Sequence, residues 1–181
     1  MIARLVYWID TASLCLGRTL AWMTLAMVLV MSGVVLMRYG LGRGSILLQD
    51  LVTYLYAAVF LLGAAYALRQ DAHVRVDILY RRLSPVRQAW INLTGTVIFL
   101  LPFCAFVLWI SRDYVTVSWR IREAAAEPDA IPTVFLLKSL IPAMAVTLAL
   151  QGIAEALRAI MILRGTPLAP NHATRPPGEV L

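Results

Sequence analysis

Side chains that could bind a metal ion are the first candidates for chemistry in this sequence. His73 has Asp71 and Asp77 close by, and the second histidine, His172, lies near the C-terminus. One imidazole with two carboxylates is a weak zinc signature, because zinc sites need better-matched ligands and outer-shell support. A haem-binding membrane subunit needs axial histidines within its helices, and both histidines lie in polar stretches. We therefore expect no metal, no cofactor and no enzymatic activity.

Charged residues inside apolar stretches would indicate a path for an ion or solute, and this sequence has few of them. Arg18, Lys138 and Glu155 all fall near the ends of such stretches, where long basic side chains can reach water. Glu155 follows Gln151 by about one helical turn and precedes Arg158 by another, so all three share a helix face. This face is interpreted either as a polar patch at the membrane interface or as a contact with a partner protein.

The elements that position these residues follow from the composition. Hydrophobic residues make up 61% of the 181 residues and charged residues 14%, against roughly 45–50% and about 25% in soluble domains. A small core cannot bury so much apolar surface, so lipid is the expected solvent. The sequence predicts an all-α integral membrane protein with short loops and four helices that each cross the roughly 30 Å hydrocarbon core. The predicted spans are about 14–38, 47–68, 88–110 and 131–157.

These spans make one membrane domain over residues 1–165. The segment 166–181 contains four prolines and little apolar surface, which predicts a disordered tail. Pro102 and Pro142 are expected to bend the third and fourth helices, and Pro132 is expected in the first turn of the fourth. Asp50, at the start of the second helix, is expected to pair with Arg38 at the end of the first.

The distribution of arginine predicts the orientation. With four spans, both termini and the loop between the second and third helices share one side, which carries ten arginines. The other side carries five arginines, with Lys138 at its margin. The positive-inside rule then places both termini in the cytoplasm. Topology and lipid headgroups explain the net charge of +6 better than nucleic acid does.

A series of short motifs follows the order of the four predicted helices. The most specific is His73-Val74-Arg75-Val76-Asp77, directly after the second helix. The others are Arg38-Tyr39, Asp50, Ile131-Pro132, Lys138 with Ile141-Pro142, and Gln151-Gly152. In this order the motifs resemble the small membrane subunit, the Q component, of tripartite ATP-independent periplasmic (TRAP) transporters. That family often has Glu where Asp50 stands, which is a mild departure.

The resemblance implies a subunit of a three-part secondary transporter in the bacterial inner membrane. In such a transporter a periplasmic binding protein delivers a solute, often an organic acid, to a large M subunit that moves it with sodium. The Q subunit braces M and offers outer surface for the binding protein, and it binds neither solute nor sodium.

Two sets of site residues follow from the resemblance. Docking of the binding protein is expected at exposed outer charges, although a merely solvated loop is the alternative: Arg112, Arg120, Arg122, Glu123, Glu127 and Asp129. Structural or partner-subunit contacts are expected at Arg38, Asp50, His73, Arg75, Asp77, Lys138, Gln151 and Glu155.

Two other functional classes stay open. One is a small membrane-anchor or redox subunit of another complex, which bound haem or metal in the purified protein would reveal. The other is a stand-alone channel or exporter, which flux through liposomes holding this chain alone would reveal.

Overall fold

The computed structural model describes residues 2–70, 83–127 and 129–165, and the regular structure in these ranges is entirely helical. The helices are α1 (Ile2–Gly40), α2 (Ile46–Arg69), α4 (Pro85–Gly95), the π-helical η1 (Thr96–Leu100), α5 (Leu101–Arg120) and α6 (Val134–Leu163). Because α4, η1 and α5 are continuous, four helical units are long and apolar enough to cross a membrane. The prediction of an all-α chain with four such helices is confirmed. The expected tail, 166–181, lies outside the described residues.

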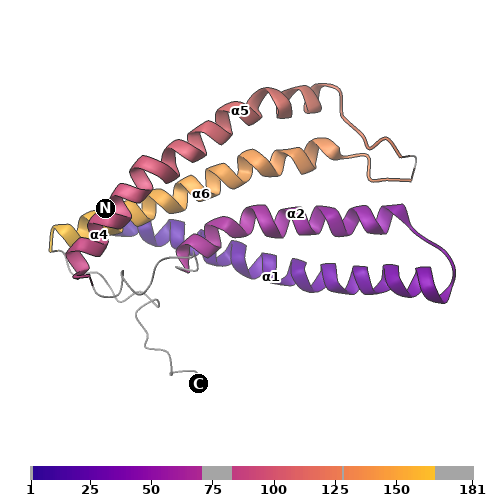
Figure 1. Ribbon diagram of the computed structural model, residues 1–181, viewed down its shortest axis with the longest axis horizontal. Coiled ribbons are helices and arrows are strands. Elements are labelled where there is room, and N and C mark those ends of the chain that lie inside the picture. Colours follow the sequence, from indigo (N-terminus) through magenta and orange to yellow (C-terminus); the bar gives the residue numbers. More distant parts are fainter. Residues whose placement is uncertain (1, 71–82, 128, 166–181) are drawn as a thin grey trace, which may run out of the picture.

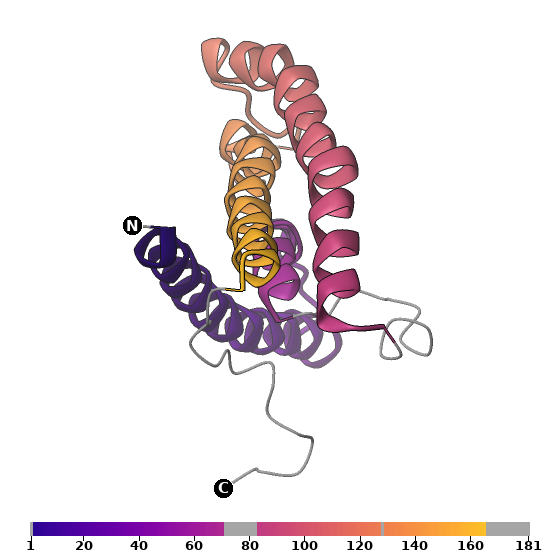
Figure 2. The same ribbon diagram turned by 90° about the vertical axis from the view of Figure 1, so that its left-hand side faces the viewer.

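The helices form two hairpins that lie side by side (Figure 1). The α1–α2 and α5–α6 connections are at one end of the bundle, here called the loop end. The start of α1 and the finish of α6 are at the opposite end, here called the terminal end. Helix α6 packs against α1, α2, α4, η1 and α5, and Figure 2 shows it between α1 and α5. It is therefore the central helix of the bundle.

Small residues allow the helices to approach one another closely, as is common for helices in membranes. On α6, Ala145, Ala154 and Ala159 are buried, and a Cβ on Gly152 would lie 2.8 Å from Leu100 Cδ2. A Cβ on Gly17 of α1 would lie 2.3 Å from the ring of Tyr66 on α2. Glycine is thus required where α1 meets α2, and it favours the contact between α6 and η1.

Pro102 affects the third membrane helix through a change in its hydrogen-bonding pattern. Proline lacks a backbone N–H, and its ring clashes with the carbonyl four residues earlier in a regular α-helix. Directly before Pro102 the chain makes the π-helical turn η1, in which the Leu101 N–H bonds to the Thr96 carbonyl. The wider turn accommodates the proline and turns Leu100 and Thr96 towards Gly152.

Several helix boundaries differ from the predicted spans. Helix α1 begins at Ile2 and α5 continues to Arg120, because a helix does not need to stop where the hydrocarbon ends. Over the added turns of α1, Val6 and Ser13 are buried in line with Leu20, so packing supports them. The expectation for Pro132 is wrong, since α6 begins at Val134 after the N-cap residue Thr133.

Candidate functional site

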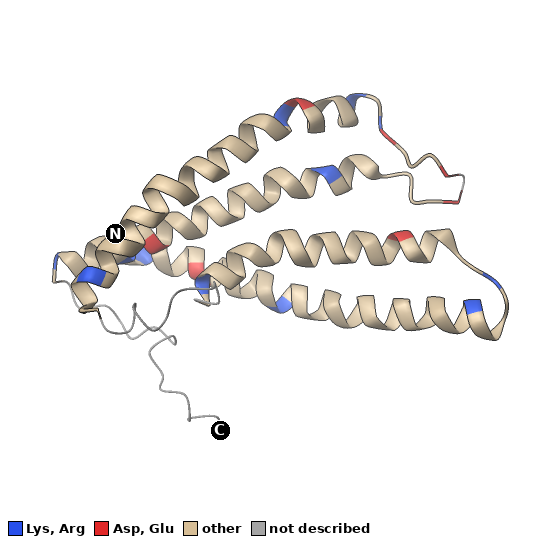
Figure 3. Ribbon diagram, viewed as in Figure 1, with Lys and Arg blue, Asp and Glu red and all other residues tan. Residues whose placement is uncertain are grey.

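Most charged residues of the described chain lie towards the helix ends, and long stretches of the helices are uncharged (Figure 3). At the terminal end, polar side chains from three helices meet around the Asp10 carboxylate. The Arg158 guanidinium donates to this carboxylate, Gln151 Nε2 donates to it at 3.3 Å, and Arg69 Nε lies 3.6 Å away. Asp10 therefore joins α1 to both α2 and α6. We call this group the terminal cluster: Asp10, Ser13, Arg69, Gln151, Glu155 and Arg158.

The terminal cluster satisfies its own charges and most of its hydrogen bonds. Arg158 also donates to Glu155, so two arginines face two acids. Gln151 is fully buried, and its amide oxygen accepts from Ser13 Oγ at 2.7 Å. Buried charges and amides are costly unless they are paired in this way. Because each carboxylate is held by an arginine, the cluster suits a role in joining helices better than a role in binding a cation.

A second group of contacts joins α5 to α6 at the loop end. Lys138 Nζ lies 2.5 Å from the Glu123 carboxylate and 4.1 Å from the centre of the Tyr114 ring. Trp119 donates through its indole N–H to Ser139 Oγ at 2.8 Å. We call this group the loop-end cluster: Tyr114, Trp119, Arg122, Glu123, Phe135, Lys138 and Ser139.

Aromatic contacts complete the loop-end cluster. The Trp119 and Phe135 rings meet edge to face with centres 4.7 Å apart. The guanidinium carbon of Arg122 lies 5.5 Å from the Phe135 ring centre and 5.7 Å from that of Trp119, within the range of cation–π attraction. Arg122 is therefore attached to this cluster although its side chain is exposed.

The backbone at the end of α5 places Glu123 against Lys138. Arg122 has a φ of 48°, a left-handed conformation that glycine usually supplies at this position after a helix. The Glu123 N–H bonds to the Ser118 carbonyl and the Arg122 N–H to the Trp119 carbonyl, which is the Schellman pattern. The hydrogen bond from Lys138 holds the pKa of Glu123 below its ordinary value. At neutral pH the Glu123 side chain is therefore ionised, and its carboxylate faces Lys138.

Asp50 has a different partner from the one predicted. Its Oδ2 accepts a hydrogen bond from the Ile131 N–H at 3.1 Å, which joins the start of α2 to the segment that leads into α6. In the described chain Arg38 is exposed and forms no ion pair with Asp50, so that expectation is wrong. The Ile131 N–H would otherwise lack a partner in this turn, and the Asp50 carboxylate supplies one.

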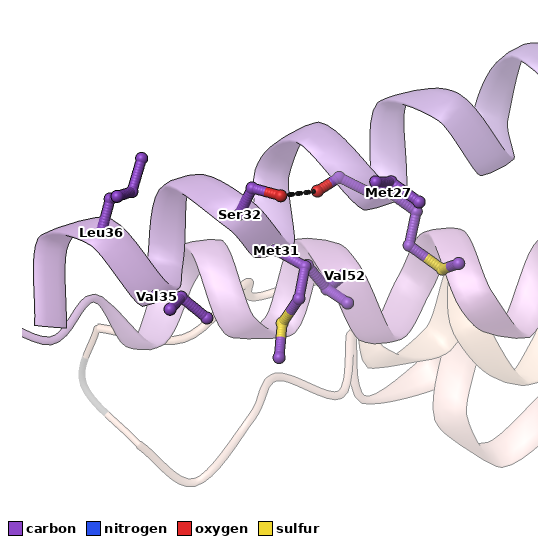
Figure 4. A pocket seen from close by; sticks show the side chains of 7 residues that line it. Met27, Met31, Ser32, Val35, Leu36 and Val52 are labelled. Carbon is purple, nitrogen blue, oxygen red and sulfur yellow. Dashed lines mark hydrogen bonds between the residues drawn. The ribbon is translucent and has the colours of Figure 1, made fainter. Parts of the chain in front are cut away.

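A groove lies between α1 and α2 (Figure 4). Its volume is about 580 Å³. The Ser32 hydroxyl within it donates its proton to the Val28 carbonyl at 2.8 Å, and the other lining side chains are apolar. The groove therefore suits an apolar occupant. It is lined by Met27, Val28, Met31, Ser32, Val35, Leu36 and Val52.

A protein-family model matches residues 27–161, about three quarters of the chain. The model describes the DctQ component of the tripartite ATP-independent periplasmic transporters. The chain belongs to this DctQ family. It is thus the small subunit of a TRAP transporter and a multi-pass membrane protein, which confirms the resemblance seen in the motifs. Comparisons with curated proteins and with solved structures give no match.

The structure divides the residues predicted for docking of a TRAP binding protein. Glu123 and Arg122 are held in the loop-end cluster. Arg112 and Arg120 are exposed, but they lie on α5 and not in a loop. Glu127 and Asp129 are also exposed, and within the described residues these four charged side chains form no ion pair. The docking role stays a prediction for all six.

The residues predicted for structural contacts do not form one site. Gln151 and Glu155 lie in the terminal cluster, and Lys138 lies in the loop-end cluster. His73, Arg75 and Asp77 lie outside the described residues, so their roles stay predictions. Among the described residues no group of three or more His, Cys, Asp and Glu could hold a metal ion.

Asp10, Ser13 and Arg69 are the members of the terminal cluster that sequence reasoning missed. One signal could have found them. Asp10 directly follows the apolar segment 5–9, and a single acid beside such a segment of a membrane helix needs a basic partner.

Proposed function

We propose that this DctQ subunit braces the large, multi-span membrane subunit of its transporter and takes no solute or coupling ion itself. The observation that carries the proposal is the way both clusters use their charges. At the terminal end the two carboxylates are paired with arginines, and at the loop end Lys138 is paired with Glu123. Ionisable groups that serve ion transport mark a pathway at membrane depth, with the ion site near the midplane, whereas both clusters of this chain lie towards the ends of the bundle.

The apolar surface supports the same role. Large hydrophobic residues are exposed along α1, α2 and α5, among them Leu29 at 64% and Phe60 at 67%. Such faces suit lipid or the helices of another membrane subunit, and the groove between α1 and α2 adds a concave apolar surface. A rigid four-helix unit fixed at both ends would extend the membrane footprint of the large subunit during uptake of an organic acid driven by an ion gradient.

Co-purification tests the bracing role. The two membrane subunits of one transporter are co-expressed with a tag on this chain only, and the large subunit is expected in the eluate in equal amount. Replacing groove residues Met27 and Met31 with Trp should reduce its recovery if the groove faces the partner. Trp replacement of Phe99 in η1 and Phe103 on α5 is the matched comparison. Absence of the large subunit even with the wild-type chain would contradict the proposal.

We further propose that the loop end faces the periplasm and that Arg112 and Arg120 contact the binding protein there. Both are exposed and without an acidic partner in the described chain, so their charges are available to another protein. Replacing both with Glu should lower the rate of solute uptake several-fold at low ionic strength. Arg164→Glu, at the opposite end, is the control and should leave uptake unchanged. Equal uptake by the wild type and the Arg112→Glu/Arg120→Glu variant would remove the docking role.

A further inference from the structure

Among the described residues, the exposed charges at the terminal end are all positive. The described basic residues there include Arg69 and Arg158, and both are used by Asp10 and Glu155 inside the terminal cluster. Those two acids are the described acids of this end. Four further arginines are exposed and form no ion pair within the described chain. We call these four the basic rim: Arg4, Arg18, Arg87 and Arg164.

The loop end carries a similar number of exposed arginines but differs in its acids. Asp113, Glu127 and Asp129 are all exposed there, so the outward surface is of mixed sign. Among the described residues, the exposed charges of the terminal end are all positive, whereas the exposed charges of the loop end are five arginines and three acids. The difference arises because the two described acids of the terminal end, Asp10 and Glu155, face inward, where the arginines of α2 and α6 hold them.

Exposed aromatic side chains accompany the basic rim. Tyr7 and Trp8 are each 65% exposed on α1, and Trp90 is 57% exposed on α4. Tyr and Trp side chains of this kind concentrate at the level of lipid headgroups. Leu5, Trp8 and the exposed Cys15 also share one side of α1, since they recur at helical spacing. A face that is apolar and aromatic, beside exposed arginine, is typical of a helix at a membrane interface.

The length of α1 places Arg18 at the boundary of the hydrocarbon core and the turns around Arg4 and Trp8 farther out. Helix α1 has 39 residues, about 58 Å at the rise of an α-helix, whereas the hydrocarbon core is roughly 30 Å thick. The apolar run 20–37 is long enough to fill that core. The turns before Arg18 therefore lie at or beyond its boundary, and Asp10 holds them against α2 and α6 with the arginines facing outward.

We propose that the basic rim binds the phosphate headgroups of anionic phospholipids in the leaflet that meets the terminal end. Guanidinium groups bind phosphate oxygens through paired hydrogen bonds, and basic residues beside a membrane helix attract anionic lipid. The exposed Trp8 and Trp90 lie on the same helices as Arg4, Arg18 and Arg87, where indole rings favour the interface between water and lipid. This lipid selectivity does not depend on the transport role, because it requires only that the helices span a bilayer.

The lipid that the subunit retains on extraction tests this proposal. The full chain is reconstituted in vesicles of phosphatidylcholine with one fifth phosphatidylglycerol and extracted with a styrene–maleic acid polymer, and the retained lipids are quantified. The wild type should retain at least about twofold more phosphatidylglycerol than the vesicle composition predicts. The variant Arg4→Gln/Arg18→Gln/Arg87→Gln/Arg164→Gln should retain the two lipids in the input ratio.

A matched variant removes the same number of exposed arginines from the loop end: Arg38→Gln/Arg43→Gln/Arg112→Gln/Arg120→Gln. It should keep the wild-type enrichment. A second measurement uses the wild type alone, in which 1 M salt should abolish the enrichment while the helical circular dichroism stays unchanged, since salt screens such contacts. Equal loss in both variants, an input ratio for the wild type, or enrichment that survives high salt would each overturn the proposal.

Discussion

At the scale of single residues, one carboxylate has more partners than any other described side chain of the terminal cluster. Asp10 faces two arginines and one amide, from α2 and α6. The contacts within α6 were predictable, because Gln151, Glu155 and Arg158 are local in sequence and recur at helical spacing. The contacts with Asp10 join residues 141 and 148 positions apart. Helical spacing carries no information about such distant partners.

Replacement of Asp10 with Asn tests its importance for stability. The variant leaves Arg69 without an acidic partner and Arg158 with Glu155 alone. Removing one member of a buried ion pair costs about 3–5 kcal/mol, and the partial exposure of Asp10, at 13%, brings the expected loss to about 2 kcal/mol. Thermal unfolding in detergent measures it. Asp113→Asn, at an exposed position, is the control, and equal midpoints for the two variants would show that the cluster adds no stability.

Glu123 makes a contribution to stability that depends on pH. Lys138 lowers its pKa from the ordinary value of 4.5, so the ionised form is favoured in the folded protein. This stabilisation is present above pH 4.5 and is lost as the pH falls through the lowered pKa. Tryptophan fluorescence should change over that acidic range, because Trp119 lies in the same cluster. Glu123→Gln should abolish the change and Glu127→Gln should preserve it, whereas an unaltered transition in Glu123→Gln would refute the assignment.

At the scale of elements, apolar runs in the sequence predicted which helices exist but not where they end. The run 20–37 identified a span, yet α1 begins at Ile2 because Val6 and Ser13 continue its buried side. Helix α5 continues past the apolar run to Arg120, and the left-handed backbone conformation of Arg122 terminates it. A search for Gly as the terminating residue could not find that end. Hydrophobicity reports the thickness of the hydrocarbon, whereas packing and capping decide the length of a helix.

Gly17 and Gly33 of α1 provide a matched pair for testing helix contact. A Cβ at Gly17 would lie 2.3 Å from the Tyr66 ring, and a Cβ at Gly33 would meet nothing within 4 Å. Gly17→Ala should lower the unfolding midpoint, at a cost of about 1–3 kcal/mol for overpacking. Gly33→Ala should raise stability slightly, by about 0.5–1 kcal/mol from helix propensity. If Gly17→Ala is as stable as Gly33→Ala, the close approach of α1 and α2 is not as described.

At the scale of the whole molecule, the arginine distribution predicts that the terminal end faces the cytoplasm. The test uses single cysteines in a Cys15→Ser background, with Cys104 left in place because it is buried. A membrane-impermeant maleimide added to intact spheroplasts should label Arg43→Cys at the loop end. Gly165→Cys at the terminal end should react only after the membrane is permeabilised. The reverse pattern would invert the topology.

The family and the number of spans were predictable from the sequence because both are written in local motifs and apolar runs. Which charged residues make internal contacts and which stay exposed was not predictable. In the sequence, Arg122 and Glu123 resemble exposed charges as much as Arg112 and Arg120 do. Only the fold of the α5–α6 connection places Arg122 and Glu123 in internal contacts. Asp50 matched the family pattern, yet its partner, the Ile131 N–H, is a backbone group that no motif identifies.

We propose that this subunit supports transport without carrying solute or ion itself. The most direct test of this claim is uptake of the transporter's radiolabelled solute into liposomes under a sodium gradient, with the binding protein outside. Liposomes that hold this chain alone should show only background uptake, and those that hold both membrane subunits should show uptake driven by the gradient. Gradient-driven uptake with this chain as the sole membrane protein would contradict the claim.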